Sequence, residues 1–121
     1  IVLAYFDDKR INFRKKISKL FFYLVNLLTS NKIKYYNSDN IYLLEDVKSY
    51  KNGGLGFAYQ AELISYLTGK NKNYIEVEIN IPFETDKSLS KISHAFKIKN
   101  ILSVILTLFK ILLMRIFYLF K

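Results

Sequence analysis

The N-terminal part of the chain contains one short apolar run and one amphipathic stretch. Residues 1–6 (IVLAYF) are apolar and precede a polar turn, which predicts a short strand. From Asn12 onward, apolar side chains recur every three or four residues, so we expect a helix that begins at this asparagine cap. The predicted apolar face consists of Phe13, Ile17, Leu20, Phe21, Leu24 and Leu28.

The middle of the chain predicts two short strands, a glycine loop and a second helix. We interpret KIKYY (32–36) and IYLL (41–44) as strands on either side of a turn rich in Asn, Ser and Asp. After the loop KNGGLG (51–56), apolar residues at helical spacing predict a helix that ends at Gly69, which would act as a left-handed cap. In this pattern Glu62 lies off the buried face.

The last part of the chain predicts a strand, a loop and a long helix. Residues 74–81 (YIEVEINI) alternate without interruption, with Ile and Val on one side and Glu and Asn on the other, which predicts a strand. Residues 83–93 show no period and are interpreted as a loop. From Ala95 to Lys121 no Gly or Pro interrupts the sequence, so we expect a helix roughly 40 Å long.

Composition narrows the classes of protein that this chain can belong to. The chain has 121 residues, 51% of them hydrophobic, which suits one domain and excludes a disordered chain. Cysteine is absent, so disulfides, thiol catalysis and cysteine-based zinc sites are excluded. His94 is the single histidine, and no protein-bound metal site is expected around it. Because the apolar opening run lacks a Met or a basic flank, we expect a fragment of a longer protein.

Positive charge is concentrated in the last third of the chain. No acidic residue follows Asp86, whereas seven of the cations behind the net charge of +9 do. These cations are Lys87, Lys91, Lys97, Lys99, Lys110, Arg115 and Lys121. Within the long helix, the polar residues 99, 103, 110 and 121 fall within about 40° of one another, and the remaining surface is apolar. The helix is therefore basic and amphipathic.

Three placements of this helix are open. A helix lying flat in a membrane interface would put its cations among anionic headgroups. A helix spanning the membrane has about the right length over residues 101–120, but Lys110 and Arg115 would each cost roughly 2.5 to 3.5 kcal/mol near the bilayer centre. The third placement is a soluble core or oligomer helix. We favour the interface of an anionic membrane; nucleic acid is not an expected partner, because the aromatic residues lie within apolar runs.

Several short motifs follow one another in a fixed order. They are Tyr5, Asp8, Lys9 and Arg10; R-K-x-x-S-x-x-F at 14–21; GFAYQAELISYL at 56–67; YIEVEI at 74–79; and the pair Ser90 and Lys91. This order resembles the C-terminal half of family 2 glycosyltransferases that act on polyprenyl phosphates, the dolichyl-phosphate mannose synthase type. The resemblance covers nearly the whole chain. The family's Arg and Gly before Ser-Lys fall here near Thr85 and on Ser88, and Lys87 is a substitute cation.

The resemblance implies an α/β fold, namely the C-terminal part of a GT-A-like nucleotide-diphospho-sugar transferase fold. Residues 1–94 would form the acceptor-side half of the transferase domain, and residues 95–121 a basic, amphipathic, membrane-associated helix. The nucleotide-binding half, with the Asp-x-Asp motif that holds a divalent cation (Mg or Mn), would lie upstream of Ile1. The fragment by itself is therefore expected to be inactive.

The resemblance also implies a reaction and a set of substrates. A sugar would pass from a nucleotide sugar to a polyprenyl phosphate at the cytoplasmic face of a membrane, as in cell-envelope polysaccharide synthesis. Arginine and lysine suit the acceptor phosphate, and a serine hydroxyl can donate to it. The candidate substrate-binding residues are Arg10, Arg14, Lys87, Ser90 and Lys91.

Two residues of the second helix are candidate catalytic residues. A phosphate acceptor is already an anion and needs no strong base, so Glu62, with Gln60 beside it, would orient a sugar hydroxyl or a neighbouring group. The alternative is that Glu62 is an ordinary helix-surface residue and that the cations are solvated. A second function of a different class is also open, namely a non-enzymatic, basic, membrane-associated interaction module. The oligomeric state is not predicted.

Overall fold

The computed structural model describes residues 1–7, 12–51, 58–80 and 98–119, and these form a mixed α/β structure. Side chains at 12–14, 98, 118 and 119 are outside this description. The elements are β1 (Val2–Tyr5), α1 (Asn12–Thr29), α2 (Leu44–Ser49), α3 (Tyr59–Gly69), β2 (Ile75–Glu78) and α5 (Ile98–Leu119). The α/β class is therefore confirmed at this level.

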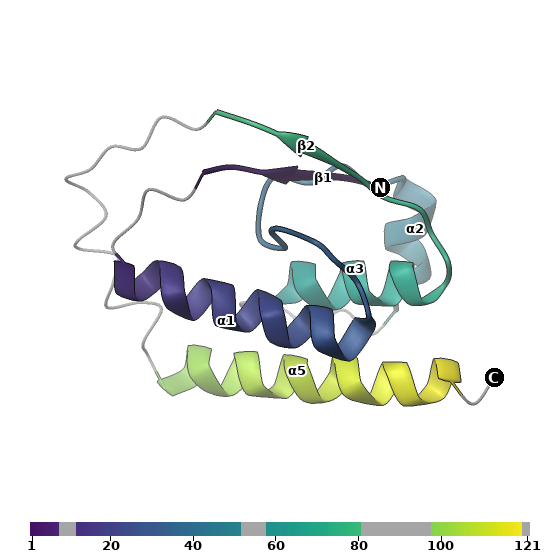
Figure 1. Ribbon diagram of the computed structural model, residues 1–121. Helices are drawn as coiled ribbons and strands as arrows, with labels where there is room; N and C mark the ends of the chain where they lie inside the picture. The colour runs from purple at the N-terminus through teal and green to yellow at the C-terminus, as the bar shows by residue number, and fades with distance from the viewer. Residues whose placement is uncertain (8–11, 52–57, 81–97, 120–121) are drawn as a thin grey trace.

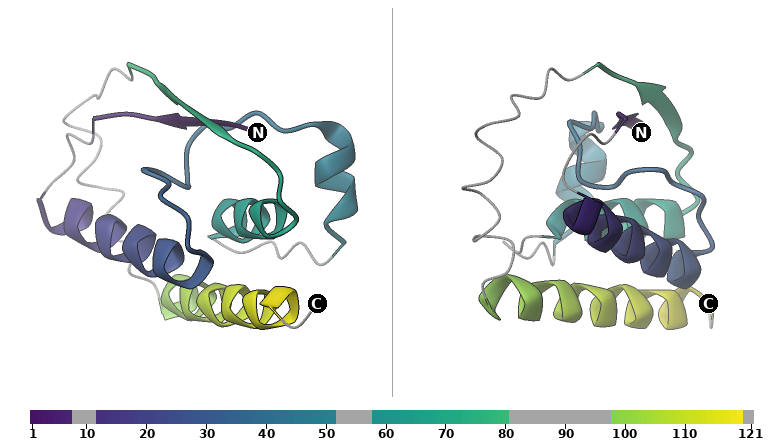
Figure 2. Two further views of the ribbon diagram at one scale, coloured as in Figure 1. Left: turned by 45° about the vertical axis from the view of Figure 1, so that its right-hand side comes forward. Right: turned by 60° about the vertical axis from the view of Figure 1, so that its left-hand side comes forward.

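The elements lie in three layers, as Figure 1 shows. β1 and β2 pair in parallel, with Val2 opposite Ile75 and Tyr5 opposite Glu78. α1 and α3 lie beneath this pair of strands, and α5 lies along the side of both helices that faces away from the strands (Figures 1 and 2). Parallel strands need a crossover connection, and the chain from α1 to α3 supplies it.

The main hydrophobic core lies between the strands and the helices and reaches α5. Its buried members are Leu3, Phe22, Val25, Ile33, Tyr36, Ala61, Ile64 and Ile111. The buried face of α1 differs from the predicted one, because Phe22 and Val25 are buried while Ile17 and Leu20 are exposed. Phe22 and Val25 belong to one core cluster with Leu3 of β1 and with the segment that follows α1, and periodicity alone does not reveal these partners.

The two strands predicted at 32–36 and 41–44 are wrong. Residues 31–43 are irregular, apart from one antiparallel bridge between Ile41 and Val2, and α2 begins at Leu44. Side-chain amides bind this backbone in place of a strand ladder. The amide of Asn26 pairs with Ile33, and Asn40 Nδ2 donates to the Tyr36 carbonyl at 3.1 Å. Because these backbone groups already have side-chain hydrogen-bond partners, they do not have to pair with another strand.

The other predicted helices and strands are confirmed over their described residues, with two adjustments. Of the described residues 74–80, only Ile75–Glu78 form a regular strand, and the apolar side chains Ile75 and Val77 are exposed. α3 ends at Gly69 as predicted, but the residue with left-handed backbone is Asn71, with φ of 60°. Asparagine tolerates that conformation, so Gly69 is not the left-handed cap. The loop predicted at 83–93 lies outside the described residues, as do residues 52–56 of the loop predicted at 51–56.

Asn26 is the main polar contact between α1 and the irregular segment. Its Nδ2 donates to Ile33 O at 2.9 Å, and its Oδ1 accepts from Ile33 N–H at 3.1 Å. The hydroxyl of Tyr36, which is buried, donates to the same Oδ1 at 2.7 Å. One side chain therefore satisfies three groups around the core.

We expect Asn26→Ala to lower the free energy of unfolding by about 2 to 4 kcal/mol, because it leaves buried polar groups without partners. Asn37→Ala, at an exposed asparagine in the same irregular segment, is the control and should change stability by less than about 0.5 kcal/mol. Urea denaturation followed by circular dichroism measures both. Equal losses in the two variants would contradict the role of Asn26.

Because of Tyr36, the free energy of unfolding is expected to decrease at alkaline pH. Burial raises the pKa of its phenol from 10.0 to about 12. The folded state therefore retains a proton that the unfolded state loses, and stability is full below pH 10 and falls as the pH rises toward 12. We expect a loss of about 2 to 3 kcal/mol from this group. Denaturation of the native chain and of Tyr36→Phe across this pH range measures the part of the loss that Tyr36 causes. The two proteins should lose stability equally if burial does not raise the pKa of this phenol.

Candidate functional site

A groove between α3 and α5 is the main candidate site in the described part of the chain. It has a volume of about 300 Å³ and is lined by Glu62 from α3 and by Lys99, Leu102, Ser103, Leu106, Thr107 and Lys110 from α5. Residues 99, 103 and 110 are the polar stripe that the sequence indicates, and they share one side of the helix. The polar stripe of α5 therefore lines the groove together with Leu102 and Leu106.

Glu62 is buried, contrary to the prediction that it lies off the buried face. Its side chain is 3% exposed, its Oε1 accepts a hydrogen bond from the Tyr50 hydroxyl, and Lys110 Nζ lies 3.4 Å from the same oxygen. The prediction failed because α3 contacts both α1 and α5 and is buried on several sides. An apolar stripe identifies only one buried side of a helix.

The pair formed by Glu62 and Lys110 sets the electrostatics of the groove. Burying a carboxylate without partners is costly, and here a phenol and an ammonium group compensate it. The Lys110 side chain is 48% exposed and thus remains partly in contact with water. The lining of the groove therefore combines cations, hydroxyls, a buried carboxylate and leucines.

Gln60 takes part in a different set of contacts. Its Oε1 accepts from Asn40 Nδ2 at 2.8 Å, and the same Nδ2 lies within hydrogen-bond distance of Tyr36 O and Tyr42 Oη. This network joins α3 to the turn before α2 and, through Asn40, to β1. Residues two apart on a helix do not face each other, so the structure does not bring Gln60 and Glu62 together in one site.

The remaining predicted site residues are not described. Arg10, Lys87, Ser90 and Lys91 lie outside the described residues, and Arg14 is in the first turn of α1, where only the backbone is described. Sequence reasoning placed the polar stripe on α5 but did not assign it to a binding site. It also missed Tyr50, because no pattern in the sequence links the end of α2 to Glu62.

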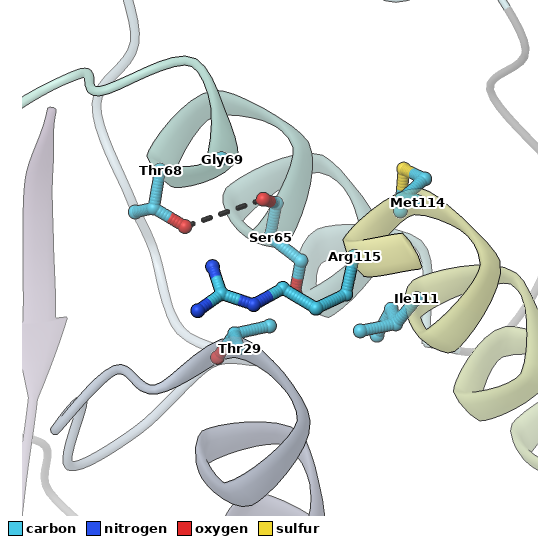
Figure 3. A pocket seen from close by; sticks show the side chains of 7 residues that line it. All are labelled: Thr29, Ser65, Thr68, Gly69, Ile111, Met114 and Arg115. Atoms are coloured by element: carbon cyan, nitrogen blue, oxygen red, sulfur yellow. Dashed lines mark hydrogen bonds between the residues drawn. The ribbon is translucent and has the colours of Figure 1, made fainter. Parts of the chain in front are cut away.

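A second, smaller cavity lies at the other end of α3, and Figure 3 shows its lining. It has a volume of about 10 Å³, enough for about one water molecule. The Arg115 side chain extends from α5 toward Thr29 and Thr68, and its Nη2 donates to Ser30 Oγ at 3.2 Å. The Ser65 hydroxyl donates to the Ala61 carbonyl at 2.6 Å. The bond from Arg115 joins α5 to the end of α1, the Ser65 bond lies within α3, and the cavity is too small for an organic ligand.

The outer side of α5 is an exposed apolar surface, which we call the apolar arc. It consists of Ile101, Leu102, Ile105, Leu106, Phe109, Leu112, Leu113, Ile116 and Phe117. At 3.6 residues per turn the arc spans about 160° of the helix. Lys99 and Lys110 border it on one side and Arg115 on the other. The inner side of the helix, with Thr107 and Ile111, is buried against α1 and α3.

By length and composition, residues Lys99–Phe117 are apolar enough to cross a membrane, with a mean hydropathy of 2.0. Only 11% of this stretch is buried. In the core helix of a soluble domain, most apolar residues are buried, whereas most of this stretch is exposed. The helix is therefore suited to membrane association.

The described residues contain no group of three His, Cys, Asp or Glu side chains that could hold a metal ion. The divalent cation implied by the family resemblance thus has no ligand set in the described part of the chain, and no step is assigned to it.

Comparison with known proteins finds no match: no protein-family model, no curated protein and no solved structure is significantly similar to this chain. The groove and the apolar arc are therefore interpreted from their own chemistry.

Proposed function

We propose that the chain is the acceptor-side part of a family 2 type glycosyltransferase that moves a sugar from a nucleotide sugar to a polyprenyl phosphate. One observation carries this proposal: cations and hydroxyls line a groove whose leucine wall continues into the apolar arc of α5. A lipid phosphate has the matching chemistry, namely an anionic head and a long apolar tail. The order of sequence motifs supports the same assignment.

The transfer needs little acid-base chemistry from this chain. An oxygen of the acceptor phosphate attacks the anomeric carbon, and the nucleoside diphosphate leaves with the electron pair of the broken bond. Because the attacking phosphate is an anion, the protein has to hold it near the donor and to stabilise its charge. Glu62 borders the groove, where its carboxylate can orient a sugar hydroxyl, whereas Gln60 positions α3 through Asn40.

The proposed location is the cytoplasmic surface of an anionic membrane, with α5 lying flat. A helix packed along α1 and α3 cannot cross the bilayer without carrying these helices with it, and the pair of Glu62 and Lys110 would then enter the apolar layer. A flat helix instead buries the apolar arc and leaves Lys99, Lys110 and Arg115 at headgroup level.

We expect Phe109→Glu to weaken binding to anionic vesicles by about tenfold to a hundredfold, because it removes one aromatic ring from the buried arc and adds a negative charge. Leu44→Glu, at a similarly exposed apolar residue of α2, is the control and should have a much smaller effect. Vesicle flotation measures both. Binding should weaken as salt is added, and equal binding to neutral vesicles at high salt would contradict the arrangement.

The transferase proposal is tested on the protein expressed from its complete coding sequence, with sugar nucleotides and polyprenyl monophosphate in detergent. We expect a lipid-linked sugar and free nucleoside diphosphate. Glu62→Gln should lower kcat by on the order of tenfold to a hundredfold through lost orientation, and Glu45→Gln, at an exposed acid of α2, should leave it unchanged. Vesicle binding without any transfer product would favour the non-enzymatic membrane module.

A further inference from the structure

The ion pair between Lys110 and Glu62 is looser than the other ion pair in the described part of the chain. Lys110 Nζ lies 3.4 Å from Glu62 Oε1, whereas Lys72 Nζ lies 2.9 Å from Asp46 Oδ1. Both lysine side chains are 48% exposed, and Glu62 is the more buried of the two acids. A strong charge-assisted bond has a length of about 2.7 to 2.9 Å. Lys110 is therefore held only weakly by the carboxylate.

Lys99 is the second cation of the groove. It lies eleven positions before Lys110 on the same side of α5, about 16 Å away along the helix axis. Each lysine carries its charge on a flexible four-carbon stem. Both lysines line the groove, and Ser103 and Leu106 lie between them along the helix. Among the described residues, no carboxylate pairs with Lys99.

We propose that the groove between α3 and α5 binds the phosphate monoester head of a lipid, with Lys99 and Lys110 as its cationic ligands. Lys110 then exchanges the Glu62 carboxylate for the phosphate, which carries a charge of about −1.5 to −2. Glu62 retains the hydroxyl of Tyr50 as a partner. This assignment rests on the proposed function for the choice of a lipid phosphate, and it adds a site on α5 to the candidates that the sequence indicates.

The surroundings of the groove favour a lipid over free phosphate. Leu102 and Leu106 line the groove and are also exposed members of the apolar arc. An acyl or isoprenoid chain attached to the phosphate can therefore leave the groove along these leucines and enter the membrane. A volume of about 300 Å³ accommodates the head and the first part of the tail. Free phosphate would leave this apolar wall in contact with water.

The test measures binding of the full chain, without sugar nucleotide, to three probes. The first is phosphatidylcholine vesicles with polyprenyl monophosphate, the second is vesicles with the same surface charge from phosphatidylglycerol, and the third is inorganic phosphate. We expect about tenfold tighter binding to the first probe than to the second. The phosphatidylglycerol headgroup is a diester, so it controls for general attraction to a negative surface.

Variants of the groove should shift this preference in opposite directions. Lys99→Gln and Lys110→Gln should each weaken binding to the polyprenyl phosphate vesicles by about fivefold to tenfold, whereas Lys48→Gln on α2 is the control. Glu62→Gln should strengthen the binding several-fold, because Lys110 no longer competes for a carboxylate. Equal losses on both kinds of vesicle, or no gain with Glu62→Gln, would overturn the proposal. Inorganic phosphate bound as tightly as the lipid would exclude the lipid tail from recognition.

A measurement on the native chain avoids dependence on folded variants. Polyprenyl phosphate should protect Lys99 and Lys110 from acetylation by acetic anhydride, while Lys48 stays reactive; unprotected groove lysines would overturn the assignment. The test also separates this site from the transferase proposal. Lipid phosphate bound in the groove without sugar transfer would remove the transferase and keep the site. Sugar transfer with an unchanged KM for the lipid in the Lys99 and Lys110 variants would keep the transferase proposal and remove the site.

Discussion

The buried carboxylate of Glu62 is the polar constraint around which α3, the end of α2 and α5 are arranged. Its partners come from two different parts of the chain, the Tyr50 hydroxyl at the end of α2 and the Lys110 ammonium group on α5. Burying a carboxylate is costly unless other groups compensate it, and here a phenol and a half-exposed ammonium group do so. Ile111 and Thr107, which are buried against α1 and α3, fix the rotation of α5 about its own axis, with Lys110 toward Glu62 and the apolar arc away from it.

This rotation explains how one helix serves both the core and the surface. Ile111 completes the hydrophobic core, and Thr107 is buried beside it, yet the apolar residues on the other side of the helix have no cover among the described residues. The same hydropathy that makes the stretch resemble a membrane span is divided between two environments. A helix fixed to α1 and α3 along its length can present its outer side to a membrane and still belong to the domain.

The sequence predicted the elements that follow a strong local period and failed where distant side chains decide the structure. α1, α3 and β2 were predicted from apolar spacing, β1 from a short apolar run and α5 from a long stretch without Gly or Pro. Residues 32–36 and 41–44 were predicted as strands, but the amide of Asn26 binds the backbone of Ile33, and that of Asn40 binds the backbone of Tyr36 and of Ala4. Burial of Glu62 was missed for a similar reason. A carboxylate is read as exposed unless its partners are known, and Tyr50 and Lys110 are far away in sequence.

In the proposed function, the geometry of α5 links binding at the groove to binding at the membrane. Leu102 and Leu106 belong to both surfaces, so a lipid whose tail lies in the bilayer would present its phosphate next to the groove. Confinement of this kind raises the effective concentration of the head group without any new contact. Two exposed lysines, one of them shared with Glu62, would then hold it. A tight phosphate site would retain the lipid after each reaction, whereas a loose one would release the glycosylated product into the membrane.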